Sequence, residues 1–174
     1  MIPRTICLHG PESTGKTTVA ARLAEALGGT VLDEYGREYA EARGTDFTMR
    51  DLVEIAKTHD AGTRMMLETA PLPLILDTDP LMTAVWADML FGTRDPWFDA
   101  WQGMADVYLL FDIDLPWVAD GTRLFGTAEA RRRFFDLSRA ELERRGVRWT
   151  MVRGQGDARA AAALTAIEAF KQQV

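Results

Sequence analysis

The stretch Gly10-Pro11-Glu12-Ser13-Thr14-Gly15-Lys16-Thr17 determines how this chain folds. It matches the pattern G-x-x-x-x-G-K-[ST], the P-loop, in which two glycines let the backbone turn sharply and point successive N–H groups at a phosphate. An apolar segment precedes it and a helical pattern follows it, so the N-terminus of a helix would face the same anion. The candidate phosphate-binding residues are Gly10, Ser13, Thr14, Gly15, Lys16, Thr17 and Thr18.

Two side chains of the P-loop have specific chemistry. Lys16 can reach the β- and γ-phosphate oxygens of a nucleotide, and the Thr17 hydroxyl is a ligand for Mg²⁺. The loop therefore predicts a bound nucleotide. It does not predict the reaction, because GTPases, ATP-driven switches and small-molecule kinases all contain it.

The composition is that of an ordinary globular protein, with 174 residues of which 47% are hydrophobic and 26% charged. Its formal net charge of −6 argues against a nucleic-acid partner. The single cysteine, Cys7, excludes an intramolecular disulfide and a cysteine-rich zinc site. No apolar run reaches the ~18 residues of a membrane helix, and no secretory signal precedes the P-loop. We expect one cytoplasmic domain over residues 1–174, with no membrane partner; the sequence does not indicate an oligomeric state.

Apolar segments alternate with longer helical patterns, which is typical of βαβ units and a parallel sheet. The fold class we predict is α/β: a P-loop NTPase or kinase fold with a five-stranded, mainly parallel sheet flanked by helices. Residues 91–103 fit either a short helix or a loop. The predicted strands are Arg4–Leu8, Thr30–Asp33, Pro71–Leu76, Val107–Phe111 and Arg148–Val152, and the predicted helices are Gly15–Leu27, Met49–Thr69, Pro80–Phe91, Ala128–Arg145 and Asp157–Gln172.

Acidic residues follow the predicted strands, at the edge where such sheets bind ligands. Asp77 ends the apolar run Leu74–Leu76, which suits a carboxylate that holds Mg²⁺ directly or through water. Asp79 either caps the next helix or shares one face of that helix with Thr83 and Trp86, as a site for a sugar diol and a flat ring would require.

A second cluster, Glu34-Tyr35-Gly36-Arg37, follows the second predicted strand. Glu34 could accept the proton of an attacking hydroxyl, and Arg37 could bind a phosphate or hold Glu34 in place. We interpret Gly36 as allowing a tight turn. The alternative is an exposed charged turn with no catalytic role.

Arginines are concentrated in a segment that we interpret as a lid, at about residues 120–135. A closing lid with arginines would place positive charge on a migrating phosphoryl group and exclude water. Successive helical residues point about 100° apart, so Arg131, Arg132 and Arg133 cannot all face a nucleotide. Arg123 and one of these three are the functional candidates, and the others suit a solvated helix face.

Several of these motifs together resemble the ribosylnicotinamide kinase domain of NadR proteins, within the P-loop kinases. The resemblance spans nearly the whole chain, and the later motifs make it more specific than the P-loop alone. The matching stretches, in order, are GPESTGKTT at 10–18, EYGREY at 34–39, LILDTD at 74–79, PWVADGTR at 116–123, the helix around 131–135 and VRG at 152–154.

The resemblance implies ATP- and Mg²⁺-dependent 5′-phosphorylation of nicotinamide riboside to nicotinamide mononucleotide. It places Glu34 and Arg37 at the substrate, Asp77 and Asp79 around metal and ribose, and Arg123 in the lid, and it leaves the general base open between Glu34 and Asp79. Further candidates are Tyr35, Trp86 and Trp117 for stacking on the substrate ring, and Arg131 and Arg159 for binding the nucleotide.

NadR proteins carry an upstream nucleotidyltransferase domain, whereas the first strand here begins at residue 4, so we expect kinase activity without adenylyl transfer or operator binding. The alternatives are a P-loop kinase for another nucleoside, nucleotide or vitamin, and a regulatory module that only hydrolyses ATP.

Overall fold

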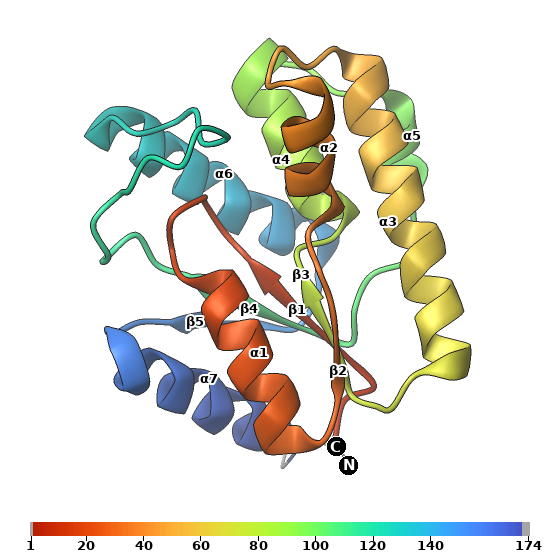
Figure 1. Ribbon diagram of the computed structural model, residues 1–174, viewed down its shortest axis with the longest axis vertical. Coiled ribbons are helices and arrows are strands. Elements are labelled where there is room, and N and C mark those ends of the chain that lie inside the picture. The colour runs from red at the N-terminus through yellow and green to blue at the C-terminus, as the bar shows by residue number, and fades with distance from the viewer. Residues whose placement is uncertain (1, 172–174) are drawn as a thin grey trace.

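The computed structural model describes residues 2–171 and contains a five-stranded sheet in the order β2-β3-β1-β4-β5 (Figure 1). All of its strand pairings are parallel, which confirms the predicted sheet. The strands are β1 (Thr5–His9), β2 (Thr30–Leu32), β3 (Leu74–Asp77), β4 (Val107–Phe111) and β5 (Trp149–Val152).

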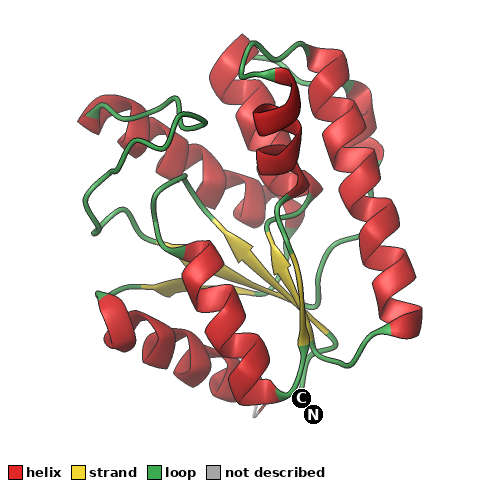
Figure 2. Ribbon diagram, in the orientation of Figure 1, coloured by secondary structure: helices red, strands yellow, loops and turns green. Residues whose placement is uncertain are grey.

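Helices cover both faces of the sheet, which is why its strands are almost continuously apolar (Figure 2). On one face, α1 (Lys16–Leu27) and α7 (Gly156–Lys171) pack on side chains such as Ile6 and Leu8 of β1. Cys7 points to the opposite face, where α6 (Ala128–Arg145) and the start of α4 (Pro80–Phe91) close the core.

The helices α2 (Tyr35–Arg43), α3 (Met49–Thr69), α4 and α5 (Pro96–Ala100) pack around a core of their own (Figure 1). Thr48 caps α3: the Asp51 backbone N–H donates to the Thr48 hydroxyl at 3.3 Å. The Thr48 backbone N–H donates back to an Asp51 carboxylate oxygen at 2.7 Å. This reciprocal cap satisfies backbone donors at the start of the longest helix of the described chain.

The ends of several strands and of α1 differ by one residue from those predicted, and the structure differs in four other places. Residues 35–43 form helix α2, so Gly36 lies within a helix and makes no tight turn. Strand β3 begins at Leu74 because Pro71 and Pro73 cannot donate to the sheet. The uncertain segment 91–103 contains the short helix α5. The last helix begins at Gly156, and its predicted end at Gln172 lies outside the described residues.

A loop over residues 113–127, here called the lid loop, connects β4 to α6. The predicted lid at 120–135 therefore consists of the end of this loop and the first turns of α6. Within residues 2–171, no helix is both long and apolar enough to span a membrane.

Candidate active site

The P-loop connects the carboxyl end of β1 to the N-terminus of α1, and its two glycines are required by the backbone. Gly10 has a φ of 127°, and a Cβ there would lie only 2.8 Å from the Phe111 carbonyl oxygen. Gly15 has a φ of 81° and caps α1. Larger residues at either position would strain the loop.

The P-loop forms the floor of a cavity of about 530 Å³, here called the P-loop cavity. Lys16 is buried there, and its Nζ donates to the carbonyl oxygens of Gly10 at 3.0 Å and Pro11 at 2.7 Å. Burial lowers the pKa of Lys16, while the nearby Glu34 carboxylate acts in the opposite direction. All seven predicted phosphate-binding residues line this cavity: Gly10, Ser13, Thr14, Gly15, Lys16, Thr17 and Thr18.

Thr17 and Asp77, the residues predicted to bind a metal ion, contact each other. The Thr17 hydroxyl donates to Asp77 Oδ2 at 2.6 Å. The other carboxylate oxygen, Asp77 Oδ1, is buried and has no hydrogen-bond partner among the described residues. A hydroxyl and a carboxylate suit Mg²⁺, which usually takes few protein ligands and completes its shell with phosphate oxygens and water. Accordingly, residues 2–171 contain no group of three or more His, Cys, Asp or Glu residues placed to hold a metal.

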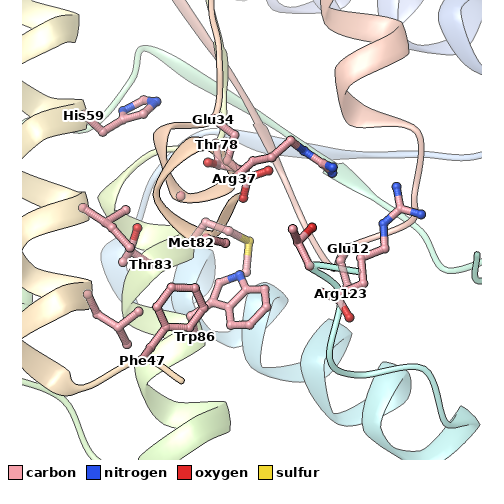
Figure 3. A pocket seen from close by; sticks show the side chains of 15 residues that line it. Glu12, Glu34, Arg37, Phe47, His59, Thr78, Met82, Thr83, Trp86 and Arg123 are labelled. Atoms are coloured by element: carbon pink, nitrogen blue, oxygen red, sulfur yellow. The ribbon is translucent and has the colours of Figure 1, made fainter. Parts of the chain in front are cut away.

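A second cavity of about 670 Å³, here called the aromatic cavity, adjoins the P-loop cavity (Figure 3). Its walls come from α2, α3, α4 and the lid loop. Phe47 and Trp86 meet edge-to-face at its apolar end, with ring centroids 6.3 Å apart. The predicted pair Thr83 and Trp86 both line this cavity.

Glu34 lies on the boundary and lines both cavities. It is the residue before α2, so the end of β2 and the start of that helix fix its position. Burial raises the pKa of Glu34 to about 6, against the opposing effect of the Lys16 ammonium. A carboxyl group with such a pKa, between a phosphate site and a second pocket, suits a general base.

Arg37 and Arg123 also line both cavities, and they approach from α2 and the lid loop (Figure 3). Asp120 holds them together: its Oδ2 lies 2.8 Å from Arg37 Nη1 and 3.1 Å from Arg123 Nε. Burial raises the pKa of Asp120, but hydrogen bonds from Arg37 and Thr122 and the charge of Arg123 outweigh it and hold that pKa well below its usual range. Sequence reasoning did not single out Asp120, although it lies within the PWVADGTR stretch.

Sequence reasoning also missed Glu12, which fastens the P-loop to the lid loop. The Phe125 backbone N–H donates to Glu12 Oε1 at 2.6 Å, and the Trp117 indole N–H donates to the same oxygen at 3.4 Å. Nearby, the Val118 backbone N–H donates to the Ser13 hydroxyl at 2.9 Å. The partners lie more than 100 positions apart, so spacing within the chain gives no signal for them.

Asp79 lines neither cavity, contrary to its predicted role at the substrate. The Leu81 backbone N–H donates to Asp79 Oδ1 at 2.9 Å and caps α4, and the Tyr108 hydroxyl donates to Oδ2 at 2.5 Å. The helix-cap alternative therefore describes its position.

Two predicted stacking residues also lie outside the aromatic cavity. Tyr35 packs edge-to-face on Tyr39 at 6.2 Å and faces a neighbouring cavity. Trp117 lies against Gly126, where an added Cβ would be 3.0 Å from the indole ring. Trp86 is the one predicted stacking residue that lines the cavity.

The two predicted nucleotide-binding arginines support the loops instead of lining the cavities. Arg131 donates to the Leu115 carbonyl at 2.8 Å and so holds the lid loop. Arg159 is 2% exposed and donates to the carbonyls of Thr14 at 2.8 Å and Gly154 at 2.7 Å. The hydrogen bond to Thr14 holds the backbone of the P-loop in place.

Comparisons with known proteins identify the family of this chain. A family described as the AAA domain matches residues 5–159. The chain belongs to the AAA domain family. This AAA domain is 29% identical over 155 residues to the trifunctional NAD biosynthesis/regulator protein NadR of Escherichia coli (strain K12). It is 30% identical over 140 residues to the NadR of Salmonella typhimurium (strain LT2). These matches cover 86% and 77% of the chain.

Solved structures give the same result. A crystal structure of a NadR protein in complex with NR matches with a TM-score of 0.77 and 25% identity, covering 97% of this chain and 50% of that one. A NadR protein in complex with NAD and AMP-PNP matches with a TM-score of 0.76 and 24% identity, covering 98% and 50%. The thymidylate kinase of Ehrlichia chaffeensis shares the fold, with a TM-score of 0.67, 15% identity and 98% coverage of both chains.

The resemblance to a NadR-type P-loop kinase domain is thus confirmed, as is the P-loop kinase fold. The AAA domain spans 38% and 34% of the length of the two curated relatives, and half of each NadR chain of known structure.

Proposed function

We propose that this protein uses ATP and Mg²⁺ to phosphorylate the 5′-hydroxyl of nicotinamide riboside, giving nicotinamide mononucleotide and ADP. The observation that carries the proposal is the position of Glu34, a carboxyl group with a pKa of about 6 on the boundary of the P-loop and aromatic cavities. A base on this boundary suits phosphoryl transfer from a nucleotide in the P-loop cavity to a hydroxyl group in the aromatic cavity.

The choice of substrate rests on the aromatic cavity and on the relatives. Trp86 and Phe47 offer aromatic faces to a flat ring, and a cationic ring gains cation–π attraction from them. NadR proteins are described as acting in NAD biosynthesis, and one of known structure binds NR. Nicotinamide riboside combines a cationic ring, which suits the end of the cavity with Trp86 and Phe47, with a primary hydroxyl, which suits the end with Glu34.

The mechanism is an in-line transfer. Glu34 accepts the proton of the 5′-hydroxyl while its oxygen attacks the γ-phosphorus. The bond from that phosphorus to the β,γ-bridging oxygen breaks, and ADP leaves. Thr17 and Asp77 would hold Mg²⁺, which supplies neutralisation of the β- and γ-phosphate oxygens. Lys16 and Arg123 stabilise the negative charge on the migrating group.

An ADP-release assay over a panel of nucleosides and vitamins, with analysis of the phosphorylated products, tests the proposal. We expect nicotinamide riboside to be phosphorylated faster than neutral nucleosides, and Lys16→Ala to abolish the transfer while the melting curve remains cooperative. A stronger reaction with another nucleoside or vitamin would identify a different kinase. Release of ADP and free phosphate with no phosphorylated acceptor would identify a regulatory ATPase.

A further inference from the structure

His59 is a buried polar side chain that the fold leaves unsatisfied. It is 4% exposed, and neither ring nitrogen has a hydrogen-bond partner among the described residues. Buried polar groups in folded proteins nearly always have partners, so such a group calls for an explanation. His59 lines the aromatic cavity, where a bound molecule could satisfy it.

The position of His59 along α3 indicates which part of a bound molecule it meets. Leu52, Ile55 and His59 share one face of the helix and all line the cavity. In Figure 3, His59 lies at the Glu34 end, opposite Phe47 and Trp86. His59 and Glu34 also line a neighbouring cavity together.

This arrangement places the sugar of a nucleoside beside His59. A molecule with its ring at Trp86 and its primary hydroxyl at Glu34 has its sugar between these two residues. Asp79, the sequence-based candidate for the sugar diol, lines neither cavity and instead accepts hydrogen bonds from the Leu81 N–H and the Tyr108 hydroxyl. Among the described residues that line the aromatic cavity, His59 is the one in which both side-chain nitrogens are buried and unsatisfied.

The chemistry of a neutral imidazole fits a hydroxyl group. Burial lowers the pKa of His59 to about 4, although the adjacent Asp60 acts in the opposite direction, so the ring is neutral at physiological pH. A neutral imidazole has one N–H donor and one acceptor nitrogen, and a hydroxyl is both donor and acceptor. The absence of a positive charge also avoids repulsion of a cationic ring.

We propose that His59 hydrogen-bonds a secondary hydroxyl of the acceptor's ribose and makes the site selective for ribosides over deoxyribosides. The inference rests on the proposed function and deepens it, since it assigns the residue that recognises the sugar. A site built to bond a hydroxyl disfavours an analogue without it, because the buried partner is then left unpaired.

The test measures kcat/KM for nicotinamide riboside and for its 2′-deoxy and 3′-deoxy analogues in wild type and three variants. His59→Phe keeps a flat ring but removes both hydrogen-bonding nitrogens. We expect this variant to lower kcat/KM for the riboside roughly ten-fold or more. For one of the two deoxy analogues, kcat/KM should change little. That analogue identifies the hydroxyl that His59 binds. His59→Asn retains a donor and an acceptor and should recover part of the selectivity.

Ile55→Val is the matched control, because it alters the same helix face without touching a polar group. It should leave the ratio of riboside to deoxyriboside unchanged, and the melting temperature of each variant shows whether it has folded. Equal losses on riboside and deoxyribosides in His59→Phe, or no loss at all, would overturn the inference.

The proposed function and the inference about His59 can fail independently. If the wild type phosphorylates no pyridine riboside, the proposed function is wrong, but the role of His59 can still be tested. The panel therefore includes purine and pyrimidine ribosides with their deoxy counterparts, whose binding is measured by calorimetry. A His59-dependent preference for any of these ribosides upholds the inference, and its absence from all of them refutes it.

Discussion

Glu34 illustrates how a single side chain acquires its chemistry from its surroundings. Burial beside the P-loop raises its pKa from 4.5 to about 6, while Lys16 limits the shift. In the folded protein the ionised form is therefore disfavoured, and ionisation costs stability as the pH rises from 4.5 through 6. The same ionised form is the one that can accept a proton, so stability and activity oppose each other at this position.

Glu34→Gln should separate these two effects. We expect kcat to fall at least about 100-fold, and the wild-type kcat/KM to rise with pH through about 6. Above pH 6 the variant should melt at a higher temperature than the wild type, and the difference should disappear below pH 4.5, where Glu34 is protonated in both states. Glu38→Gln, an exposed residue of the same helix, is the control. Unchanged activity of Glu34→Gln would exclude it as the base.

Local patterns predicted those elements whose positions depend on local chemistry. The P-loop, the apolar β3 strand ending at Asp77 and the Thr48 cap each follow from a few neighbouring residues. Helix α2 was missed because its nine residues include Gly36 and bury only Tyr39 and Ala40. Packing on α3 stabilises it, and no periodic pattern of its own indicates a helix.

The candidate site was predictable to the same extent. The P-loop residues, Glu34 and Arg37 line the P-loop cavity as their motifs suggested, whereas Tyr35 lies outside it. The environment of Asp79 depends on Tyr108, which reaches it from β4. Likewise the bond from the Phe125 N–H to Glu12 joins segments that only the folded chain brings together. The spacing of residues in the sequence can identify a reactive side chain, but it cannot show which residue from a remote segment forms a hydrogen bond with it in the folded protein.

The lid loop and α2 meet at Asp120, and this contact should set the affinity for the γ-phosphate. Removing the carboxylate in Asp120→Asn leaves the Arg37 and Arg123 guanidinium groups to repel each other. We expect affinity for a non-hydrolysable ATP analogue to fall roughly ten-fold, while affinity for ADP changes little, as measured by calorimetry.

Asp136→Asn is the control for Asp120→Asn, because its ion pair with Arg132 is exposed on α6 and distant from both cavities. A surface pair of this kind contributes little. Equal losses of affinity for ADP and the ATP analogue in Asp120→Asn would show that Asp120 acts on the fold rather than on the arginines.

Across the whole molecule, Arg159 joins three segments that are distant in sequence. It donates to the Thr14 carbonyl of the P-loop and to the Asp112 carbonyl beyond β4 at 2.5 Å, and it pairs with Asp114 at 2.5 Å. It also bonds the Gly154 carbonyl after β5. The stability of the sheet edge and the shape of the P-loop therefore depend on the same buried charge.

Arg159→Leu should consequently weaken folding and nucleotide binding together. Loss of a buried, fully bonded guanidinium leaves carbonyl oxygens unpaired, and we expect the melting temperature to fall by roughly 10 °C and ADP affinity to fall with it. Arg153→Leu is the matched control: Arg153 pairs with Asp112 at 2.7 Å but is 68% exposed, so its loss should change neither quantity measurably. If the two variants melted alike, or if Arg159→Leu lost stability but bound ADP normally, Arg159 would not be what couples the P-loop to the rest of the fold.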